Sequence, residues 1–369
     1  MKRFLCHTLG GAALALSFSF SAPVLAQENI AHPGTATQSI DYYDGTMNDV
    51  LTTSVTPVST FHKSNFVTGN TVTLNSNTVS HVFGAVNFGD TDALSGNRAV
   101  INGGTVRNLV EGALHVLENG NTSALNNRVE INGGTVGNTT GGQAASDVSG
   151  DALASNNTVV ITGGTINGIV FGGLAGSASG QAVASNNTVR IGPGLPATVF
   201  GSNALLVGGY ANTNTGTAVS TGNTLQIESA GLSVERLGYF QRFEFTLPAG
   251  LANSDTVLIS TAWTDIGTNA VMTVSAAPGF TVSPGDAFIL IDGTGSTFSG
   301  TVAAASQSGT IGGYPYTLAV ESDTVVLRIL QPVQSRVTTS VPVAGGGVLA
   351  ALGLLLAGLA AAGLRRRRC

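Results

Sequence analysis

Cysteine is almost absent from the chain. The two cysteines, Cys6 and Cys369, lie near its two ends, so the residues between them offer no thiol for a disulfide, a zinc site or a nucleophile. The five histidines do not fall at the spacing of two metal ligands on one helix face. Glu111 and His115 are four residues apart, but they lie in a pattern of strands and turns. We therefore expect no catalytic residue, no cofactor and no metal site.

Charged side chains are also scarce, at 9% of the chain, and aromatic residues make up 6%. Residues 27–340 hold twenty acidic and nine basic side chains, a net charge of −11. This balance favours solubility and argues against nucleic acid as a partner. The chain is nevertheless too apolar to be disordered, and its 50 glycines suit many turns between short strands.

One short segment recurs along the middle of the chain, and its clearest copies read Asn-x-Val-x-Ile-x-Gly-Gly-Thr. Four copies follow one another at intervals of 30 residues, and looser copies flank them: they begin at Asn97, Asn127, Asn157 and Asn187, with Asn70 and Asn223 outside. A fixed period of this length is typical of stacked repeats. A single copy is too short to bury an apolar face, so the copies are expected to stack on one another.

Within each copy the apolar residues alternate with a period of two, which predicts a short strand. Val159 and Ile161 are expected to point into a core, and Val160 is expected to face solvent. We predict an all-β fold: a parallel β-solenoid, or β-helix, with one repeat of about 30 residues in each coil.

Doubled asparagines recur at one bend of successive coils, at Asn126-Asn127, Asn156-Asn157 and Asn186-Asn187. Their side-chain amides could form a hydrogen-bonded ladder along the stack, and asparagine tolerates the left-handed backbone of a sharp corner. The alternative is a polar stripe that binds a ligand. The ladder is the better interpretation.

The first 26 residues resemble a signal peptide. Lys2 and Arg3 form a basic start, an apolar stretch follows, and cleavage is expected after Ala26, with Ala22 as the alternative. A second alternative is that this segment is retained as a membrane anchor.

Three further regions follow the signal peptide. Residues 27–68 are polar and are predicted to cap the solenoid; Asp41 and Asp44 could form a metal pair there, but a solvated turn is the preferred interpretation. Residues 69–232 form the repeats. Residues 233–332 are predicted to be less regular β-structure that caps the C-terminal end.

The repeats resemble the passenger region of autotransporter-type outer-membrane proteins. The resemblance covers roughly residues 70–330 and depends on the asparagine repeats, on the Gly-Tyr-Phe run at Gly238 and on the strand that begins at Gly285. It implies an exported, surface-associated β-solenoid. The residues after Leu330 are too few for a translocating β-barrel, so secretion through a barrel of its own is not expected.

A linker at 333–340 leads to a C-terminal tail, residues 341–369. Gly345–Leu364 are 20 residues without a charge, enough to cross a bilayer as one transmembrane helix. Four arginines follow and are predicted to stop transfer and stay cytoplasmic: Arg365, Arg366, Arg367 and Arg368.

The tail resembles the C-terminal protein-sorting signals of Gram-negative bacteria. Val341, Pro342 and Val343 stand where the PEP-CTERM and IPTL-CTERM types have their short motif, and Gly345–Gly347 also resemble the GlyGly-CTERM type. The resemblance implies a transient inner-membrane anchor and a sorting protease or transpeptidase of the exosortase or rhombosortase type. The alternative is a permanent tail anchor.

These patterns favour a non-enzymatic structural or adhesin-like protein, at the cell surface, in the outer membrane or secreted. Surface polysaccharide or matrix is a candidate partner. The alternative is an enzyme that acts on polysaccharide, on a pectin-lyase-like β-helix. Such an enzyme would need clustered charges on one face, whereas Arg98, Arg128, Glu130 and Arg190 look singly scattered in the sequence. A further alternative is an autotransporter fragment whose barrel is encoded elsewhere.

Overall fold

The computed structural model describes residues 37–39, 68–69, 71–75, 78–87, 92–252, 256–293, 295 and 297–332. The chain divides into two units, Met1–Gln331 and Pro332–Cys369, and every strand described belongs to the first. Several predicted segments lie outside the described residues: the signal peptide 1–26 with Ala26, most of the cap 27–68 with Asp41 and Asp44, the linker 333–340, the motif Val341–Val343, the span Gly345–Leu364 and the arginines Arg365–Arg368.

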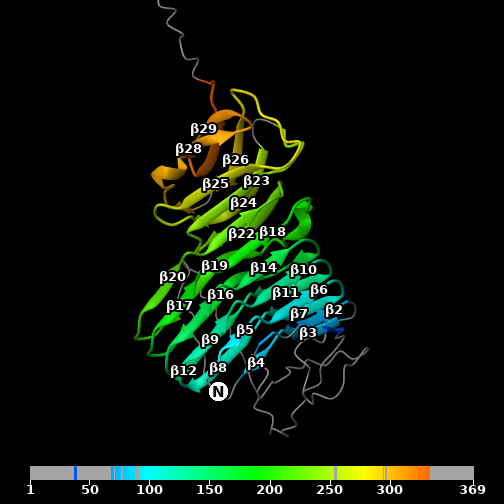
Figure 1. Cartoon of the computed structure of the whole chain (residues 1–369), viewed down its shortest axis with the longest axis vertical. Coiled ribbons are helices and arrows are strands. Elements are labelled where there is room, and N and C mark those ends of the chain that lie inside the picture. Colours follow the sequence, from blue (N-terminus) through cyan, green and yellow to red (C-terminus); the bar gives the residue numbers. More distant parts are fainter. Residues whose placement is uncertain are drawn as a thin grey trace, which may run out of the picture. The chain divides into compact units, whose positions relative to one another are not determined.

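The described part of the chain is all-β. Three sheets wind together into a parallel β-solenoid of about seven coils, as the repeat predicts (Figure 1). Successive copies pair in register, so that Val129 lies beside Val159 and Val159 lies beside Val189. Within the described ranges the helical elements are two short 3-10 turns, η1 (Ala197–Val199) and η2 (Ala304–Ser306).

Sheet 1 contains the strand of the recurring segment. Its nine parallel strands are, in spatial order, β1 (Thr37–Ser39), β2 (Thr71–Leu74), β6 (Arg98–Ile101), β10 (Arg128–Ile131), β14 (Thr158–Ile161), β18 (Thr188–Ile191), β21 (Thr224–Ile227), β23 (Arg242–Leu247) and β25 (Val271–Ala276).

Sheet 2 carries the second and third strands of each coil. Its parallel strands are β3 (Thr78–Phe83), β4 (Val86–Asn87), β7 (Thr105–Glu111), β8 (Leu114–Asn119), β11 (Thr135–Thr140), β12 (Gln143–Ser149), β15 (Thr165–Ile166), β16 (Ile169–Ser177), β19 (Leu205–Thr213), β22 (Leu232–Gly238), β24 (Thr256–Asp265), β26 (Ala287–Asp292) and β27 (Thr297–Ser299).

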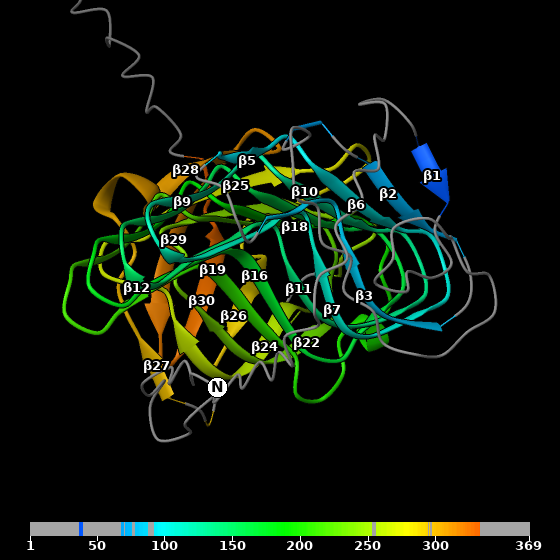
Figure 2. The same ribbon diagram turned by 90° about the horizontal axis from the view of Figure 1, so that it is seen from below.

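Sheet 3 closes each coil and leads back to sheet 1. Its strands are β5 (Leu94–Ser95), β9 (Thr122–Leu125), β13 (Ala152–Ser155), β17 (Ala182–Ser185) and β20 (Ala218–Thr221). Viewed along the stack, strands of sheets 1 and 3 run along one side of the coils and strands of sheet 2 along the other (Figure 2).

The core is divided into two compartments. The larger one packs Val129 and Ile131 of sheet 1 against Val136 of sheet 2. The smaller one, between sheets 2 and 3, is lined mainly by alanines, such as Ala124 and Ala144. Short alanine side chains fill this compartment, whereas the larger one is filled by valine, isoleucine, leucine and phenylalanine.

Glycines lie at the boundary between the compartments, where sheet 2 bends. A Cβ atom on Gly141 would lie 2.3 Å from the carbonyl oxygen of Gly172 on the next coil, a distance that side chains do not tolerate. The same close contact recurs along one column of the stack: Gly84, Gly112, Gly141, Gly172 and Gly208. The backbones of neighbouring coils meet here without side chains between them.

The strand alternation in sheet 1 is as predicted, but the exposure of its outer face is not. Val159 is fully buried in the larger compartment. Val160 lies outside that compartment but is only 5% exposed, so the expectation that it faces solvent is wrong. In register it lies between Glu130 and Arg190 of the neighbouring coils, and long side chains beside a short one reduce its contact with water.

Parallel pairing continues past residue 232, where the sequence suggested that less regular structure begins. Strands β23 and β25 add two further rungs to sheet 1, and Phe243 and Phe245 fill the core there. Three antiparallel strands then cover the end of sheet 2: β30 (Thr324–Ile329) pairs with β26, β29 (Tyr314–Glu321) with β30, and β28 (Ser308–Ile311) with β29.

Candidate functional site

A ladder of buried asparagine side chains runs through the solenoid beside the glycine column. The Oδ1 atom of Asn127 accepts hydrogen bonds from the backbone N–H and the Nδ2 of Asn97, at 2.9 and 3.0 Å. The same two bonds link Asn127 to Asn157, Asn157 to Asn187, and Asn187 to Asn223, at 2.9 to 3.1 Å. The predicted ladder is confirmed for the second asparagine of each pair. These asparagines are at most 1% exposed and therefore do not form a ligand-binding stripe, whereas Asn126, Asn156 and Asn186 are exposed.

The remaining amide hydrogens of the ladder bind backbone carbonyls of sheet 3. The Nδ2 of Asn157 also donates to the carbonyl of Ala124, at 2.9 Å, and the Nδ2 of Asn187 donates to that of Ala154, at 3.0 Å. A buried amide is stabilising only when its donors and acceptors are paired. The ladder therefore ties each coil to its neighbour and sheet 3 to sheet 1.

The residue before each ladder asparagine has a left-handed backbone. The φ angles of Asn126, Asn156 and Asn186 are 56°, 57° and 55°. Gly96 and Gly222 take the same place in the coils on either side, with φ angles of 67° and 69°. Asparagine and glycine adopt this conformation at the least cost, so each member of a doubled asparagine has its own role.

The ladder ends on a residue that the repeat pattern does not reveal. The Oε1 atom of Gln241 accepts the backbone N–H and the Nδ2 of Asn223, at 2.9 and 3.3 Å. The glutamine side chain is one carbon longer than that of asparagine. It continues the amide ladder although Gln241 follows Asn223 by only 18 residues. The only sequence signal is its place just before β23.

Ion pairs join the coils on the outer face of sheet 1. Glu130 accepts hydrogen bonds from Arg98, one coil earlier, and from Arg128 on its own strand. Arg190 pairs with Glu228 at 2.6 Å. Three of the side chains that looked scattered in the sequence, Arg98, Arg128 and Glu130, are thus brought together, because Arg98 and Glu130, 32 residues apart, lie on adjacent rungs. Arg190 remains apart from them.

The carboxylate of Glu130 stays charged in this arrangement. Burial acts to raise its pKa, but the hydrogen bonds and positive charges of Arg98 and Arg128 outweigh burial, so the pKa lies below its usual value. The Glu130 side chain is 14% exposed, whereas those of Arg98 and Arg128 are 43% and 42% exposed. Two cations therefore share one anion at the surface.

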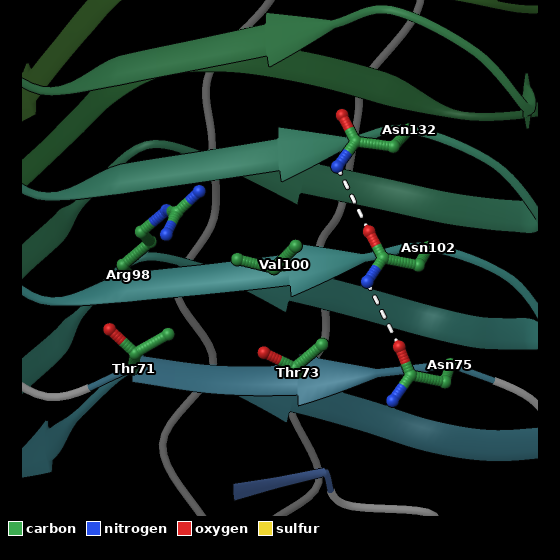
Figure 3. Close-up of a pocket in the computed structure, with 7 residues that line it drawn as sticks. All are labelled: Thr71, Thr73, Asn75, Arg98, Val100, Asn102 and Asn132. Carbon is green, nitrogen blue, oxygen red and sulfur yellow. Dashed lines mark hydrogen bonds between the residues drawn. The ribbon is translucent and has the colours of Figure 1, made fainter. Parts of the chain in front are cut away.

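A shallow polar depression of about 390 Å³ lies beside this cluster, on the outer face of sheet 1 (Figure 3). Three coils supply its lining: Thr71, Thr73, Asn75, Arg98, Val100, Asn102 and Asn132. Its side chains are hydroxyls, amides and one guanidinium around a single valine. We take this depression as the candidate functional site, since it combines a concave surface with polar groups that reach solvent, among them Arg98, Asn75 and Asn102.

A second, exposed ladder forms one side of the depression. The Nδ2 of Asn102 donates to the Oδ1 of Asn75, and the Nδ2 of Asn132 donates to that of Asn102, both at 2.9 Å (Figure 3). The hydroxyl of Thr162 continues the row to Asn132, at 2.7 Å. These bonds hold the amides in a fixed orientation at the solvent boundary.

Two ionisable residues that the sequence singled out lie elsewhere. Glu111 is fully buried, neither carboxylate oxygen has a hydrogen-bond partner, and burial raises its pKa well above the usual value. His115 is also buried, and its Nδ1 accepts the backbone N–H of Ser123 at 2.9 Å.

The described residues contain no group of three or more His, Cys, Asp or Glu side chains arranged to hold a metal ion. In the same part of the chain no helix has the length and apolar character needed to span a bilayer. Comparisons with protein-family models, with curated proteins and with solved structures find no match to this chain.

Proposed function

We propose that this protein is a non-enzymatic structural or adhesin-like component of the surface of a Gram-negative bacterium. The observation that carries the proposal is the continuous bonding between coils. The buried ladder from Asn97 to Gln241 crosses six residues on successive coils, and ion pairs such as Arg98 with Glu130 link neighbouring coils at the surface. A stack bonded in this way suits a load-bearing or display role.

The exposed face of sheet 1 supports a role in contact with other surfaces. It presents a polar depression in which the side-chain amides of Asn75, Asn102 and Asn132 hold one another in place by hydrogen bonds. Polar groups that are fixed before a ligand arrives lose little entropy when they bind it. Surface polysaccharide or extracellular matrix is the class of partner that we propose.

The proposed route of export uses both ends of the chain. A signal peptide is removed after Ala26, and the apolar span Gly345–Leu364 holds the chain in the inner membrane for a time. A sorting protease or transpeptidase of the exosortase or rhombosortase type then acts at Val341–Val343. Its action releases the solenoid or attaches it again at the outer surface.

Protease treatment of intact cells tests the proposal. Cells that produce the protein are exposed to an added protease, and the chain is followed with an antibody against the solenoid. We expect digestion or shedding in intact cells, and weaker adhesion to surfaces by a strain that lacks the gene. Full protection in intact cells, with digestion only after lysis, would rule out surface display.

A further inference from the structure

The depression on sheet 1 lies next to a local excess of positive charge. Arg98 and Arg128 share the single carboxylate of Glu130, which leaves one net positive charge on this patch. By contrast, Arg190 higher on the same sheet is paired one to one with Glu228. This local positive charge lies on a body of net charge −11, which as a whole repels anions.

Arg98 keeps hydrogen-bonding capacity on the side of the depression. A guanidinium has five N–H donors, and the Nε and Nη2 atoms of Arg98 each give one to Glu130. The side chain is 43% exposed and lines the depression. Its remaining donors can therefore reach an anionic group placed there, and guanidinium groups bind carboxylate and sulfate with favourable geometry.

The rest of the lining suits neutral hydroxyl groups. The hydroxyl of Thr71 and the amides of Asn102 and Asn132 can each donate and accept hydrogen bonds, whereas Thr73 is buried. None of the described residues that line the depression is aromatic, so it offers no platform for stacked bases. The asparagines of the exposed ladder recur on rungs about 4.8 Å apart, which suits a polymer better than a small ion.

We propose that this depression binds an anionic polysaccharide. A carboxylate or sulfate of the polymer lies against Arg98, and sugar hydroxyls bind Thr71 and the Asn75–Asn102–Asn132 ladder. Glu130 does not prevent binding, because its charge is already compensated by two arginines. The inference rests on the proposed surface function and names the ligand class that this function requires.

Binding of the purified full chain to three immobilised polymers tests the inference. The polymers are polygalacturonate, which carries carboxylates, dextran sulfate, which carries sulfates, and neutral dextran. We expect binding to at least one anionic polymer, weakening with salt, and none to dextran. The anionic polymer with the lower Kd shows whether Arg98 prefers a carboxylate or a sulfate.

Two variants that lose the same charge locate the site. Arg98→Gln is expected to raise the Kd roughly fivefold to tenfold, because a charged hydrogen bond at a half-exposed site is lost. Arg190→Gln is the matched control: its side chain is 41% exposed, it lies on the same sheet, and it is outside the depression. We expect its Kd to stay within about twofold of wild type.

A third variant keeps Arg98 and its ion pair. Thr71→Glu places a carboxylate in the depression beside Arg98, with which Thr71 is in register, and is expected to abolish binding to the anionic polymers. Urea unfolding checks that all variants are folded. If Arg98→Gln does not fold, the loss or retention of binding in Thr71→Glu tests the location of the site instead.

Three results would overturn the inference. They are no binding to either anionic polymer, binding to dextran as tight as to the anionic polymers, or an equal rise of the Kd in Arg98→Gln and Arg190→Gln. None of them affects surface display, which the protease experiment measures separately. If the chain is displayed on cells but fails to bind these polymers, the proposed ligand class is refuted and the proposed surface function still stands.

Discussion

Gly141 and Gly172 meet on successive coils so closely that a Cβ atom on the first would lie 2.3 Å from the carbonyl oxygen of the second. This contact lies where sheet 2 bends between the two core compartments, next to the asparagine ladder. A side chain there must push two coils apart or distort the bend. The glycine column is therefore as much a part of the repeat as the ladder itself.

Gly141→Ala should lower the free energy of unfolding by about 2–4 kcal/mol, the range for a substitution that overpacks a rigid site. Gly192→Ala is the control, because the nearest atom to a Cβ there is a methyl carbon of Thr162 at 3.1 Å. Its cost should be less than about 1 kcal/mol. Urea denaturation followed by circular dichroism measures both. Similar losses for the two variants would contradict the close packing of coils at the bend.

The two asparagine ladders should differ sharply in their contribution to stability. Asn157→Ala removes a buried rung and leaves the N–H groups of Asn127 without their acceptor, so we expect a loss of about 2–4 kcal/mol. Asn132→Ala removes a rung of the exposed ladder, where water replaces the lost partners, and should cost less than about 1 kcal/mol. Unfolding midpoints for the two variants, measured side by side, test this order. The reverse order would mean that the buried ladder is not what holds the coils.

Glu111 should make the protein less stable as the pH rises. Its pKa in the folded chain lies above the unfolded value, so no penalty applies below the unfolded pKa, near 4.5. The penalty grows as the pH rises from there through the folded pKa. Glu111→Gln should therefore stabilise the protein near pH 7.5, on the order of 1–3 kcal/mol, and much less near pH 4.

Glu130→Gln is the opposite case and serves as the control for Glu111. The pKa of Glu130 is lowered in the folded chain, so its stabilisation is present above the unfolded pKa and is lost as the pH falls. This variant should destabilise near pH 7.5 and have little effect at low pH. Unfolding curves are measured at both pH values. If Glu111→Gln and Glu130→Gln changed the free energy of unfolding in the same direction near pH 7.5, the account of Glu111 would be refuted.

Much of the fold could be predicted from the spacing of one residue type. Asn97, Asn127, Asn157 and Asn187 recur every 30 residues, and that period predicts the coil, the register and the ladder. It does not predict the two compartments, because the bend at Gly141 depends on contacts between coils. Nor does it reveal Gln241, which completes the ladder at a different spacing.

The candidate site was harder to predict than the fold. Arg98 and Glu130 are 32 residues apart, which is one coil plus two steps along a strand, and this arithmetic could have revealed their ion pair. The burial of Val160 could not be read from alternation, since it depends on the long side chains beside it. Glu111 lies in register between Phe83 and Thr140, neighbours that become visible only once the register is known.

The most direct test of the central proposal, an exported and processed surface solenoid, is the intact mass of the protein recovered from culture medium and from membranes. We predict a chain that begins at Gln27 and lacks the tail beyond the Val341–Val343 motif, with or without an added anchoring group. A precursor that still carries Gly345–Leu364 and the four arginines should accumulate when Val341 and Pro342 are both replaced by alanine. A wild-type mass equal to that of the whole chain, in every fraction, would contradict the proposal.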